Sequence, residues 1–477
     1  MSFFRGTINR RSCRNGLSVI LKSGLILALL LWTMSCGTRR TEGIKVGVGE
    51  TIITPPIGTP MSGYDRRGHV STGVHDDLHA RSLVIEDGDT ALVLMSVSVI
   101  NIGRKNLEEI RAGINKQTGI SEHNIIISAT HTHSGPAIEE QGPYRDFFVE
   151  RCIQSAIEAW NSRIPGRVGV SSTEVLELGR NDRRLEYGGL HPDPEVAILK
   201  VEDAKGRLLG VAFNYGCHPS ALDLHNLEFT EDWPYYAIQG LKEKFGREVW
   251  VAYFQSAQGD IKVGYTAEHS AIGAEMPIRN FWYAELKGRQ MSEAVLKTLP
   301  EIATSPSLIL KATYGFFDYP RRDTYPLTLK EAKQKYEEAK TRLEEMEKKA
   351  GMIGKRVLDK YRVEEFLARL AFNTARWVET HTHPEPLSLE QQAVRIGDAV
   401  FVTFPVEVFS EIGLKVKQQS PFEKTFVIGL ASGHGGYIPT AAEFLEGGYA
   451  VVMTTFSPEC EKVCIDASLE LIERLRD

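Results

Sequence analysis

Residues 125–136 read Ile-Ile-Ile-Ser-Ala-Thr-His-Thr-His-Ser-Gly-Pro, an apolar run followed at once by two histidines. The run Ile125–Ser128 is typical of a buried strand in an α/β sheet. Ligand sites of such sheets lie at strand ends, and residues two apart on an extended segment share a face. We therefore expect His131 and His133 to point into one cavity, where one binds a metal and the other moves a proton or orients a ligand. Two surface histidines at a turn are the alternative.

The rest of the chain alternates strand-like and helical patterns. Strand-like runs occupy residues 45–49, 91–97, 208–213 and 248–254, with helical patterns between them at residues 144–160 and 234–245. Strands that alternate with helices predict an α/β fold with a buried sheet and flanking helices. We expect residues 44–477 to form a single domain.

One segment of the chain differs in composition. Between Glu331 and Lys349, twelve of nineteen residues are charged, and apolar residues recur there at helical spacing. A second helix, at about residues 357–378, is expected to return against the first. The pattern predicts a helical hairpin inserted at about residues 328–380, with a narrow apolar seam that packs the two helices together.

The composition and the charge limit the possible partners. The chain has 477 residues, of which 42% are hydrophobic and 25% charged, as in soluble globular proteins. This excludes a disordered chain and a polytopic membrane protein. The net charge is -6, and the mature chain is more negative still because the first 35 residues carry five basic residues and no acid. We expect no nucleic-acid partner, since a negative chain repels polyphosphate.

Residues 1–36 are interpreted as an export signal. The apolar run Gly24–Trp32 is too short to cross a bilayer comfortably and is typical of a signal-peptide core. Cys36 follows a small residue and resembles the lipidated cysteine of bacterial lipoproteins, although Thr33 stands where Leu or Val is usual. We expect a protein that is periplasmic, attached to the outer membrane through lipidated Cys36, or secreted. An incidental cysteine in an ordinary signal peptide is the alternative.

Three more polar side chains follow apolar runs. His218 lies in the stretch Asn214–Pro219, which follows the apolar run 208–213, Glu407 ends Phe404-Pro-Val-Glu407, and Tyr437 lies in a glycine-rich loop. Imidazole nitrogens together with carboxylate and phenolate oxygens suit Zn²⁺. Asp260, in a Gly-Asp turn, is a candidate for orienting the site, although aspartate is also an ordinary turn residue. The spacing alone leaves open whether these residues converge.

In their order along the chain, these motifs resemble those of the neutral/alkaline, non-lysosomal ceramidases and their bacterial relatives. The matching motifs are Gly63-Tyr64, Gly73-Val-His75, Ala80-Arg81, Thr130–Pro136, Cys217-His218-Pro219, Asp232–Ala237, Gly259-Asp260, Pro405-Val-Glu407 and Gly436–Thr440. The resemblance implies a ceramidase-type α/β catalytic domain of mixed β-sheets flanked by helices. It implies one catalytic Zn²⁺ per chain, bound by His131, His218, Glu407 and Tyr437.

The same resemblance implies roles beside the metal. His133 matches the second histidine of the family's His-Thr-His motif, at the reacting centre, and Tyr449 matches a further tyrosine of the site. The family also uses an arginine after an asparagine, for which Arg183 is the nearest match and Arg184 a rival.

Two departures from the family bear on the substrate. Lys262 stands where the ceramidases carry a serine that was proposed to be catalytic, and the following proline is missing. The ceramidases also append an immunoglobulin-like domain, which we do not expect here because the sequence ends at Asp477. A lysine cannot imitate a serine nucleophile, so direct attack by water is the favoured mechanism. Lys262 is expected to bind a substrate anion or to be solvated at the pocket rim.

The sequence therefore predicts an exported zinc hydrolase that cleaves an N-acyl amide in a small molecule or lipid. His133 is expected to shuttle the proton, and Tyr449 and Arg183 to stabilise the oxyanion. A zinc esterase or carbohydrate-directed hydrolase on the same fold is one alternative, and a non-catalytic binding lipoprotein is another. The charged hairpin favours a polar or short-chain substrate over a long-chain one.

Overall fold

The computed structural model describes residues 43–64, 68–88, 90–138, 142–274, 276 and 278–476. The segment with the predicted export signal and Cys36 lies outside these residues, so its interpretation stays a prediction. Within the described part of the chain, none of the helices combines the length and the hydropathy that a transmembrane span requires.

The largest element is an eight-stranded mixed sheet with the order β11-β9-β8-β6-β1-β3-β4-β5. Its strands are β1 (Lys45–Ile52), β3 (His79–Asp87), β4 (Thr90–Val97), β5 (Ile125–Ala129), β6 (Ile164–Glu174), β8 (Glu195–Asp203), β9 (Leu208–Tyr215) and β11 (Trp250–Gln255). The pairs β4/β5 and β9/β11 are parallel, and the other pairs are antiparallel. The edge strands β5 and β11 also contact each other, so the ends of β5, β9 and β11 meet in one region.

A second sheet of four strands has the order β13-β14-β15-β17. Its strands are β13 (Leu310–Tyr319), β14 (Leu387–Ile396), β15 (Ala399–Thr403) and β17 (Lys424–Ile428). Three two-stranded pairs lie in the connecting segments: β2 (Gly73–Val74) with β10 (Glu228–Phe229), β7 (Arg180–Asn181) with β12 (Ile261–Lys262), and β16 (Glu407–Val408) with β18 (Tyr437–Ile438). One apolar core is shared by residues of both larger sheets, including Leu94, Phe254 and Phe401.

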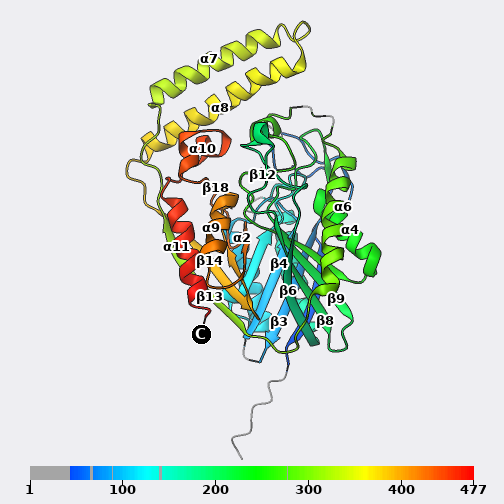
Figure 1. Cartoon of the computed structure of the whole chain (residues 1–477). Coiled ribbons are helices and arrows are strands. Elements are labelled where there is room, and N and C mark those ends of the chain that lie inside the picture. The colour runs from blue at the N-terminus through cyan, green and yellow to red at the C-terminus, as the bar shows by residue number, and fades with distance from the viewer. Residues whose placement is uncertain are drawn as a thin grey trace, which may run out of the picture. The chain divides into compact units, whose positions relative to one another are not determined.

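Helices flank both sheets (Figure 1). The helices are α2 (Arg104–Thr118), α3 (Pro143–Asn161), α4 (Trp233–Phe245), α5 (Ala267–Ala271), α6 (Phe281–Thr298), α9 (Ser410–Gln419), α10 (Tyr449–Met453) and α11 (Cys460–Glu473). Short 3-10 turns are η1 (Glu122–Asn124), η2 (Leu185–Tyr187), η3 (Leu299–Glu301) and η4 (Ala442–Leu445). Helix α3 packs on β1 and β3, α4 on β11, and α11 on β13 and β14. The predicted α/β fold of mixed sheets flanked by helices is confirmed.

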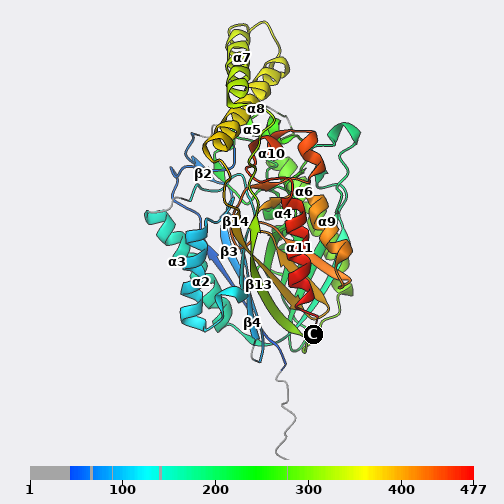
Figure 2. The same cartoon turned by 90° about the vertical axis from the view of Figure 1, so that its left-hand side faces the viewer.

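The inserted hairpin is present as α7 (Leu329–Glu347) and α8 (Lys355–Thr380). A capping box between Thr328 and Glu331 starts α7. The expected seam exists, because Ala339 and Leu343 of α7 are buried and Tyr336 stacks on Phe372 of α8 at 5.8 Å. The seam covers only part of the surface of α8, however. Both views show α8 beside α10, Figure 2 also shows α5 beside α8, and α8 contacts both helices (Figures 1 and 2).

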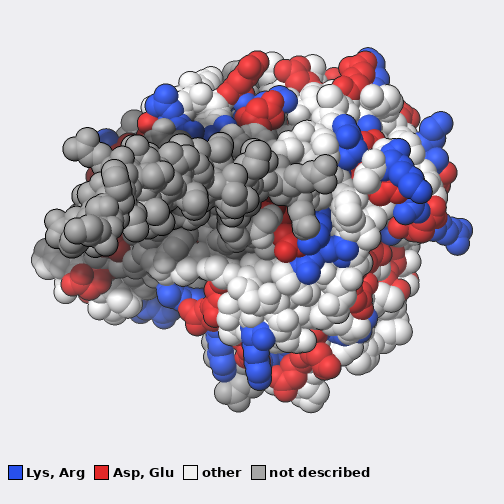
Figure 3. All heavy atoms as spheres, turned by 90° about the horizontal axis from the view of Figure 1, so that it is seen from below, with Lys and Arg blue, Asp and Glu red and all other residues white. Residues whose placement is uncertain are grey.

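Charged residues of both signs lie side by side on the face seen from below (Figure 3). Among the described residues that this view shows, basic side chains alternate with acidic ones. Such mixing is typical of a solvated protein surface.

Candidate metal centre

The predicted ligands lie in four chain segments that meet in one region of the fold. His131 follows β5, His218 follows β9, and Glu407 and Tyr437 begin β16 and β18. The strands β16 and β18 pair in parallel, with Glu407 directly opposite Tyr437. The backbone register therefore puts the carboxylate and the phenol side by side at the end of the sheet.

The four side chains meet in a buried cluster. The Oε2 atom of Glu407 lies 3.1 Å from Nε2 of His131 and 3.3 Å from Nε2 of His218. The hydroxyl of Tyr437 lies 3.4 Å from Nε2 of His218. All four residues are at most 7% exposed. Sequence reasoning therefore selected residues that the structure brings together, and their role as ligands stays a prediction.

The backbone orients both imidazoles. Nδ1 of His131 lies 2.7 Å from the carbonyl oxygen of Ile100, and Nδ1 of His218 lies 3.0 Å from that of Ile261. Because a carbonyl only accepts, each Nδ1 must carry a proton and donate it, and in the neutral imidazole this leaves a lone pair on Nε2. Both lone pairs then face the Glu407 carboxylate. This is the arrangement of nitrogen and oxygen donors that a divalent metal requires.

The polar atoms of the cluster are suited to binding a cation. Nε2 of His131 and Oε2 of Glu407 are buried and have no hydrogen-bond donor among the described residues. Burial tends to raise the pKa of Glu407, but His131, His218 and His434 outweigh it and hold this pKa well below its usual range. Burial lowers the pKa of His218 to about 3, so its imidazole is neutral at physiological pH. An ionised carboxylate beside the neutral imidazole of His218 is ready to bind a metal.

His133 lies at the edge of the same cluster. Its ring centroid is 5.0 Å from that of His131 and 5.5 Å from that of His218. One nitrogen of each of the three rings lies within 4.8 Å of the others, so the three histidines could also hold a metal ion. Both ring nitrogens of His133 are buried without a hydrogen-bond partner in the described structure. Burial, with His131 and His218 nearby, lowers its pKa well below the usual value.

The geometry differs from the expectation in one detail. His131 has a φ of 71°, in the left-handed region, so the segment that carries the two histidines is not extended. Their ring planes stand at 85° to each other instead of sharing one face. Both side chains still reach the same cluster because the chain turns sharply at His131. Such backbone strain in a residue other than glycine is common at functional sites.

A cavity of about 320 Å³ opens beside the cluster. His133, Tyr437 and Tyr449 line it from the cluster side, and Phe366 of α8 lines it from the hairpin. Phe366 is 1% exposed and its ring stacks on Tyr449 of α10 at 5.7 Å. The inserted hairpin therefore forms part of the cavity wall, which the helical periodicity did not indicate.

The two candidate arginines lie beyond Tyr449, beside a second cavity of about 280 Å³. Arg183 pairs with Glu443 and donates to the carbonyl oxygen of Gly447 at 2.7 Å. Arg184 pairs with Glu443 and Glu446. The side chain of Arg183 is 13% exposed and that of Arg184 38%. The structure thus places Arg183 deeper beside Tyr449, and the role proposed for it stays a prediction.

Lys262 is buried, contrary to the alternative of solvation at the pocket rim. Its Nζ lies 3.1 Å from a carboxylate oxygen of Asp182, and the two side chains are 4% and 5% exposed. Asp260 does not reach the metal cluster: it accepts hydrogen bonds from Asn181 at 2.8 Å and from the backbone of Ser410 at 2.7 Å. Asp260 instead fastens the strand that carries Lys262 to the start of α9.

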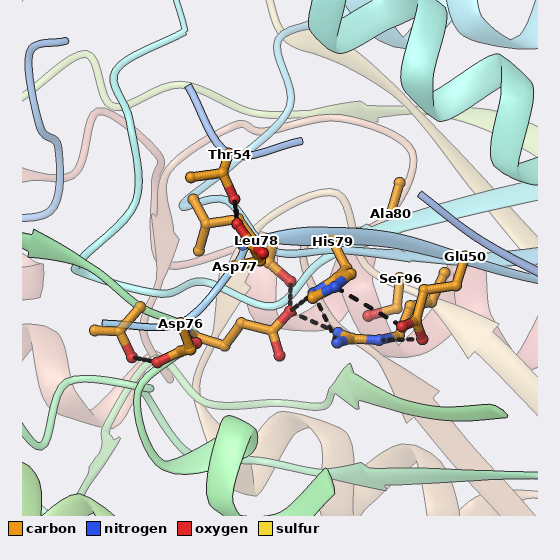
Figure 4. Close-up of polar contacts among 12 residues, drawn as sticks. Glu50, Thr54, Asp76, Asp77, Leu78, His79, Ala80 and Ser96 are labelled. Atoms are coloured by element: carbon orange, nitrogen blue, oxygen red, sulfur yellow. Dashed lines mark hydrogen bonds and ion pairs between the residues drawn. The ribbon is translucent and has the colours of Figure 1, made fainter. Parts of the chain in front are cut away.

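Two groups near the candidate ligands were not assigned a role from the sequence. Nε2 of His434 lies 3.6 Å from Oε1 of Glu407, next to the candidate ligands. Arg81 bridges Glu231 at 2.6 Å and Glu50 at 3.0 Å. Figure 4 shows Glu50 and His79 in this network of polar contacts. Arg81 belongs to a motif that the sequence analysis quoted. Only the fold shows that its partners lie in distant segments.

The Arg81 network supports the loop that carries the two histidines. Ser98 donates to Glu231 at 2.6 Å, and Thr132 donates to the carbonyl oxygen of Thr230 at 2.8 Å. Burial tends to raise the pKa of Glu231, but Arg81 outweighs it, with help from His79, and lowers this pKa far below the usual range. Glu231 is therefore a buried anion whose position depends on Arg81.

Comparison with known proteins identifies a family that the N-terminal part of the described chain resembles. Residues 44–263 match the family described as neutral/alkaline non-lysosomal ceramidase, N-terminal. The neutral ceramidase of Drosophila pseudoobscura pseudoobscura is 27% identical over 272 residues, which cover 49% of this chain and 38% of the relative. The chain therefore matches well under half of the length of that relative.

Two solved structures share the fold. The crystal structure of the neutral ceramidase from Pseudomonas aeruginosa matches 91% of this chain and 75% of its own, with a TM-score of 0.69 and 19% identity. A ceramidase complexed with C2 matches 91% of this chain and 76% of its own, with a TM-score of 0.68 and 18% identity. At these identities the likeness shows a common architecture.

Proposed function

Because residues 44–263 belong to the neutral/alkaline non-lysosomal ceramidase family, we propose that this protein is a zinc-dependent hydrolase of N-acyl amides. The observation that supports this most is the meeting of two oriented imidazoles with the Glu407 carboxylate beside a cavity. We propose that it acts after export and is attached to a membrane through lipidated Cys36, on the basis of the pattern in residues 1–36.

His131, His218, Glu407 and Tyr437 would hold the metal. When bound there, Zn²⁺ supplies a Lewis acid that polarises the scissile carbonyl and makes water a better nucleophile near neutral pH. The carbonyl groups of Ile100 and Ile261 keep the two imidazoles in the tautomer that can bind it. Tyr437 lies against Glu407 through the β16/β18 register, which fixes the two oxygen donors together.

His133 is the residue proposed to move the proton. It lines the cavity, and its two ring nitrogens have no partner among the described residues, so a ring nitrogen is available to substrate or water. It would accept a proton as the amide carbon is attacked and return it to the leaving nitrogen. Tyr449 lines the same cavity and would donate to the developing oxyanion, an interaction worth roughly 3 kcal/mol. Arg183 would support it from the neighbouring cavity.

Lys262 is not proposed as a nucleophile. Its Nζ atom is buried and lies 3.1 Å from a carboxylate oxygen of Asp182. A lysine that displaced an amide would also form a new, stable amide and stop turnover. Attack by water is therefore retained as the mechanism.

A substrate panel tests this function. The purified protein, loaded with Zn²⁺, is assayed on N-acyl compounds of different chain length and on esters with the same acyl groups. We expect amide cleavage that disappears with a chelator and returns with Zn²⁺. Cleavage of esters but of no amide would replace the proposal by the zinc-esterase alternative, and metal binding without any hydrolysis would support a binding protein.

The hairpin is expected to determine which acyl chain lengths of the substrate the cavity accepts. Phe366→Ala removes a buried ring that lines the cavity, so longer acyl chains should gain about tenfold in relative kcat/KM, the lower end of what one methylene contributes in an apolar pocket. Phe372→Ala is the matched control, because Phe372 stacks on Tyr336 within the hairpin. An unchanged chain-length profile in Phe366→Ala, with folding intact, would contradict this role.

A further inference from the structure

The cavity beside the metal cluster has a charged wall and an apolar wall. Lys262 and His133 line it on the cluster side, whereas Phe366, Leu370 and Met453 line it on the side of α8 and α10. Its volume of about 320 Å³ is at the lower end of those that hold small ligands. The cavity therefore suits a compact molecule with one polar and one apolar end.

Lys262 is the one charged residue among the described residues that line this cavity. No acidic side chain of the described lining balances it from inside the cavity. Its ion-pair partner Asp182 lines the neighbouring cavity instead. A ligand that enters beside Lys262 therefore meets a cation that is buried among neutral and apolar groups.

The Lys262 ammonium has more N–H donors than its contact with Asp182 engages. A lysine offers three N–H donors, and the contact with Asp182 at 3.1 Å engages at most one or two of them. The Nζ atom is itself buried, with no neutral hydrogen-bond partner among the described residues. A buried ammonium with so few partners is costly, and an anion in the cavity would relieve that cost.

The position of Lys262 is coupled to the candidate metal ligand His218. Lys262 directly follows Ile261, whose carbonyl oxygen accepts from both the backbone N–H and Nδ1 of His218, each at 3.0 Å. The strand β12 is held by its pairing with β7, in which Lys262 lies opposite Arg180. Lys262 therefore has a fixed place close to the reacting centre.

We propose that Lys262 recognises an anionic group that the substrate carries near the scissile amide. The substrate class is then a short-chain N-acyl compound whose amine part bears a carboxylate or sulfonate, such as an N-acyl amino acid. The apolar wall of Phe366, Leu370 and Met453 takes the acyl chain, and His133 faces the amide between the two ends. This inference deepens the proposed amide hydrolysis and rests on it.

Binding of analogues that cannot be hydrolysed tests the inference apart from turnover. 4-Oxononanoic acid replaces the amide nitrogen of N-hexanoylglycine by a methylene group, and 1-hydroxynonan-4-one is its neutral counterpart. 4-Oxononane-1-sulfonate is the corresponding mimic of an N-acyl aminosulfonate. The dissociation constants of the three probes are measured by titration calorimetry on the zinc-loaded protein.

We expect an anionic probe to bind at least about tenfold more tightly than the alcohol, as for a hydrogen bond to a charged group. The acid and the sulfonate together identify which anion fits. In Lys262→Met the preference should fall below about twofold, whereas Lys262→Arg should keep part of it. The double variant Lys262→Met/Asp182→Asn leaves no unpaired carboxylate in the core. It should lose the preference for the anionic probe in the same way. Thermal unfolding checks that this variant is folded.

Equal binding of all three probes, no measurable binding of any probe, or a preference that survives in both Met-containing variants would overturn the inference. Hydrolysis of neutral N-acyl compounds together with equal probe binding would leave the proposed function in place and remove only the role of Lys262. Lysine-dependent binding of an anionic probe without hydrolysis of any amide would keep the anion site and remove the proposed function.

Discussion

His218→Ala is expected to remove most of the metal from the purified protein and most of its hydrolytic activity. His218 is fully buried, and its Nε2 faces both Glu407 and Tyr437. Loss of a group that merely orients a ligand weakens metal affinity by about 10- to 100-fold, so loss of a ligand itself should exceed 100-fold. The metal affinity is measured by competition with a chelator, and the activity is measured with the most reactive amide of the panel.

His225→Ala is the matched control for that variant. His225 is the histidine of a nearby loop, its side chain is 63% exposed, and it contacts Asp223 at 3.2 Å. Its replacement should leave both metal affinity and activity within about twofold, as for a surface change. Full metal content in His218→Ala would refute the assignment of His218 as a ligand.

Arg81→Met is expected to give the largest loss of stability. Arg81 and Glu231 are paired at 2.6 Å with side chains only 4% and 1% exposed, so the substitution removes the arginine that balances the buried charge of Glu231. Breaking a buried pair by removing one partner costs about 3–5 kcal/mol. The free energy of unfolding is measured by urea denaturation at neutral pH, where Glu231 is ionised in the native state.

Two further variants separate this cause from a general effect of losing an arginine. Arg104→Met removes a pair with Glu108 whose side chains are 66% and 60% exposed, and it should cost less than about 1 kcal/mol. Arg81→Met/Glu231→Gln removes the stranded charge and should recover part of the loss. An Arg81→Met variant as stable as Arg104→Met would show that the network does not support the histidine loop.

His131, His218 and Glu407 could be predicted because each follows an apolar run, and strands of an α/β sheet bring such positions together. His131 after β5 and His218 after β9 are examples. The neighbourhood of Glu407 and Tyr437 depends on the β16/β18 pairing, two residues on each strand. No local periodicity reveals so short a pairing, and only the order of the motifs indicated it.

Other features depend on contacts between distant segments, which the sequence does not encode locally. The charge pattern predicts that α7 and α8 pack together, but the contact of Phe366 with Tyr449 joins residues 83 positions apart in the chain. The burial of Lys262 depends on Asp182, and the surroundings of Arg183 depend on Glu443. The left-handed backbone of His131 likewise follows from the turn that the assembled site imposes.

Anomalous diffraction at the zinc absorption edge, from crystals of the protein purified with Zn²⁺, tests the central claim most directly. The account predicts one strong peak per chain, within bonding distance of Nε2 of His131, Nε2 of His218, a carboxylate oxygen of Glu407 and the phenolic oxygen of Tyr437, with His133 outside the ligand set. A peak bound by His131, His133 and His218 without Glu407 would contradict the ligand assignment. The absence of any peak at the cluster, in protein that keeps its activity, would contradict the metal centre itself.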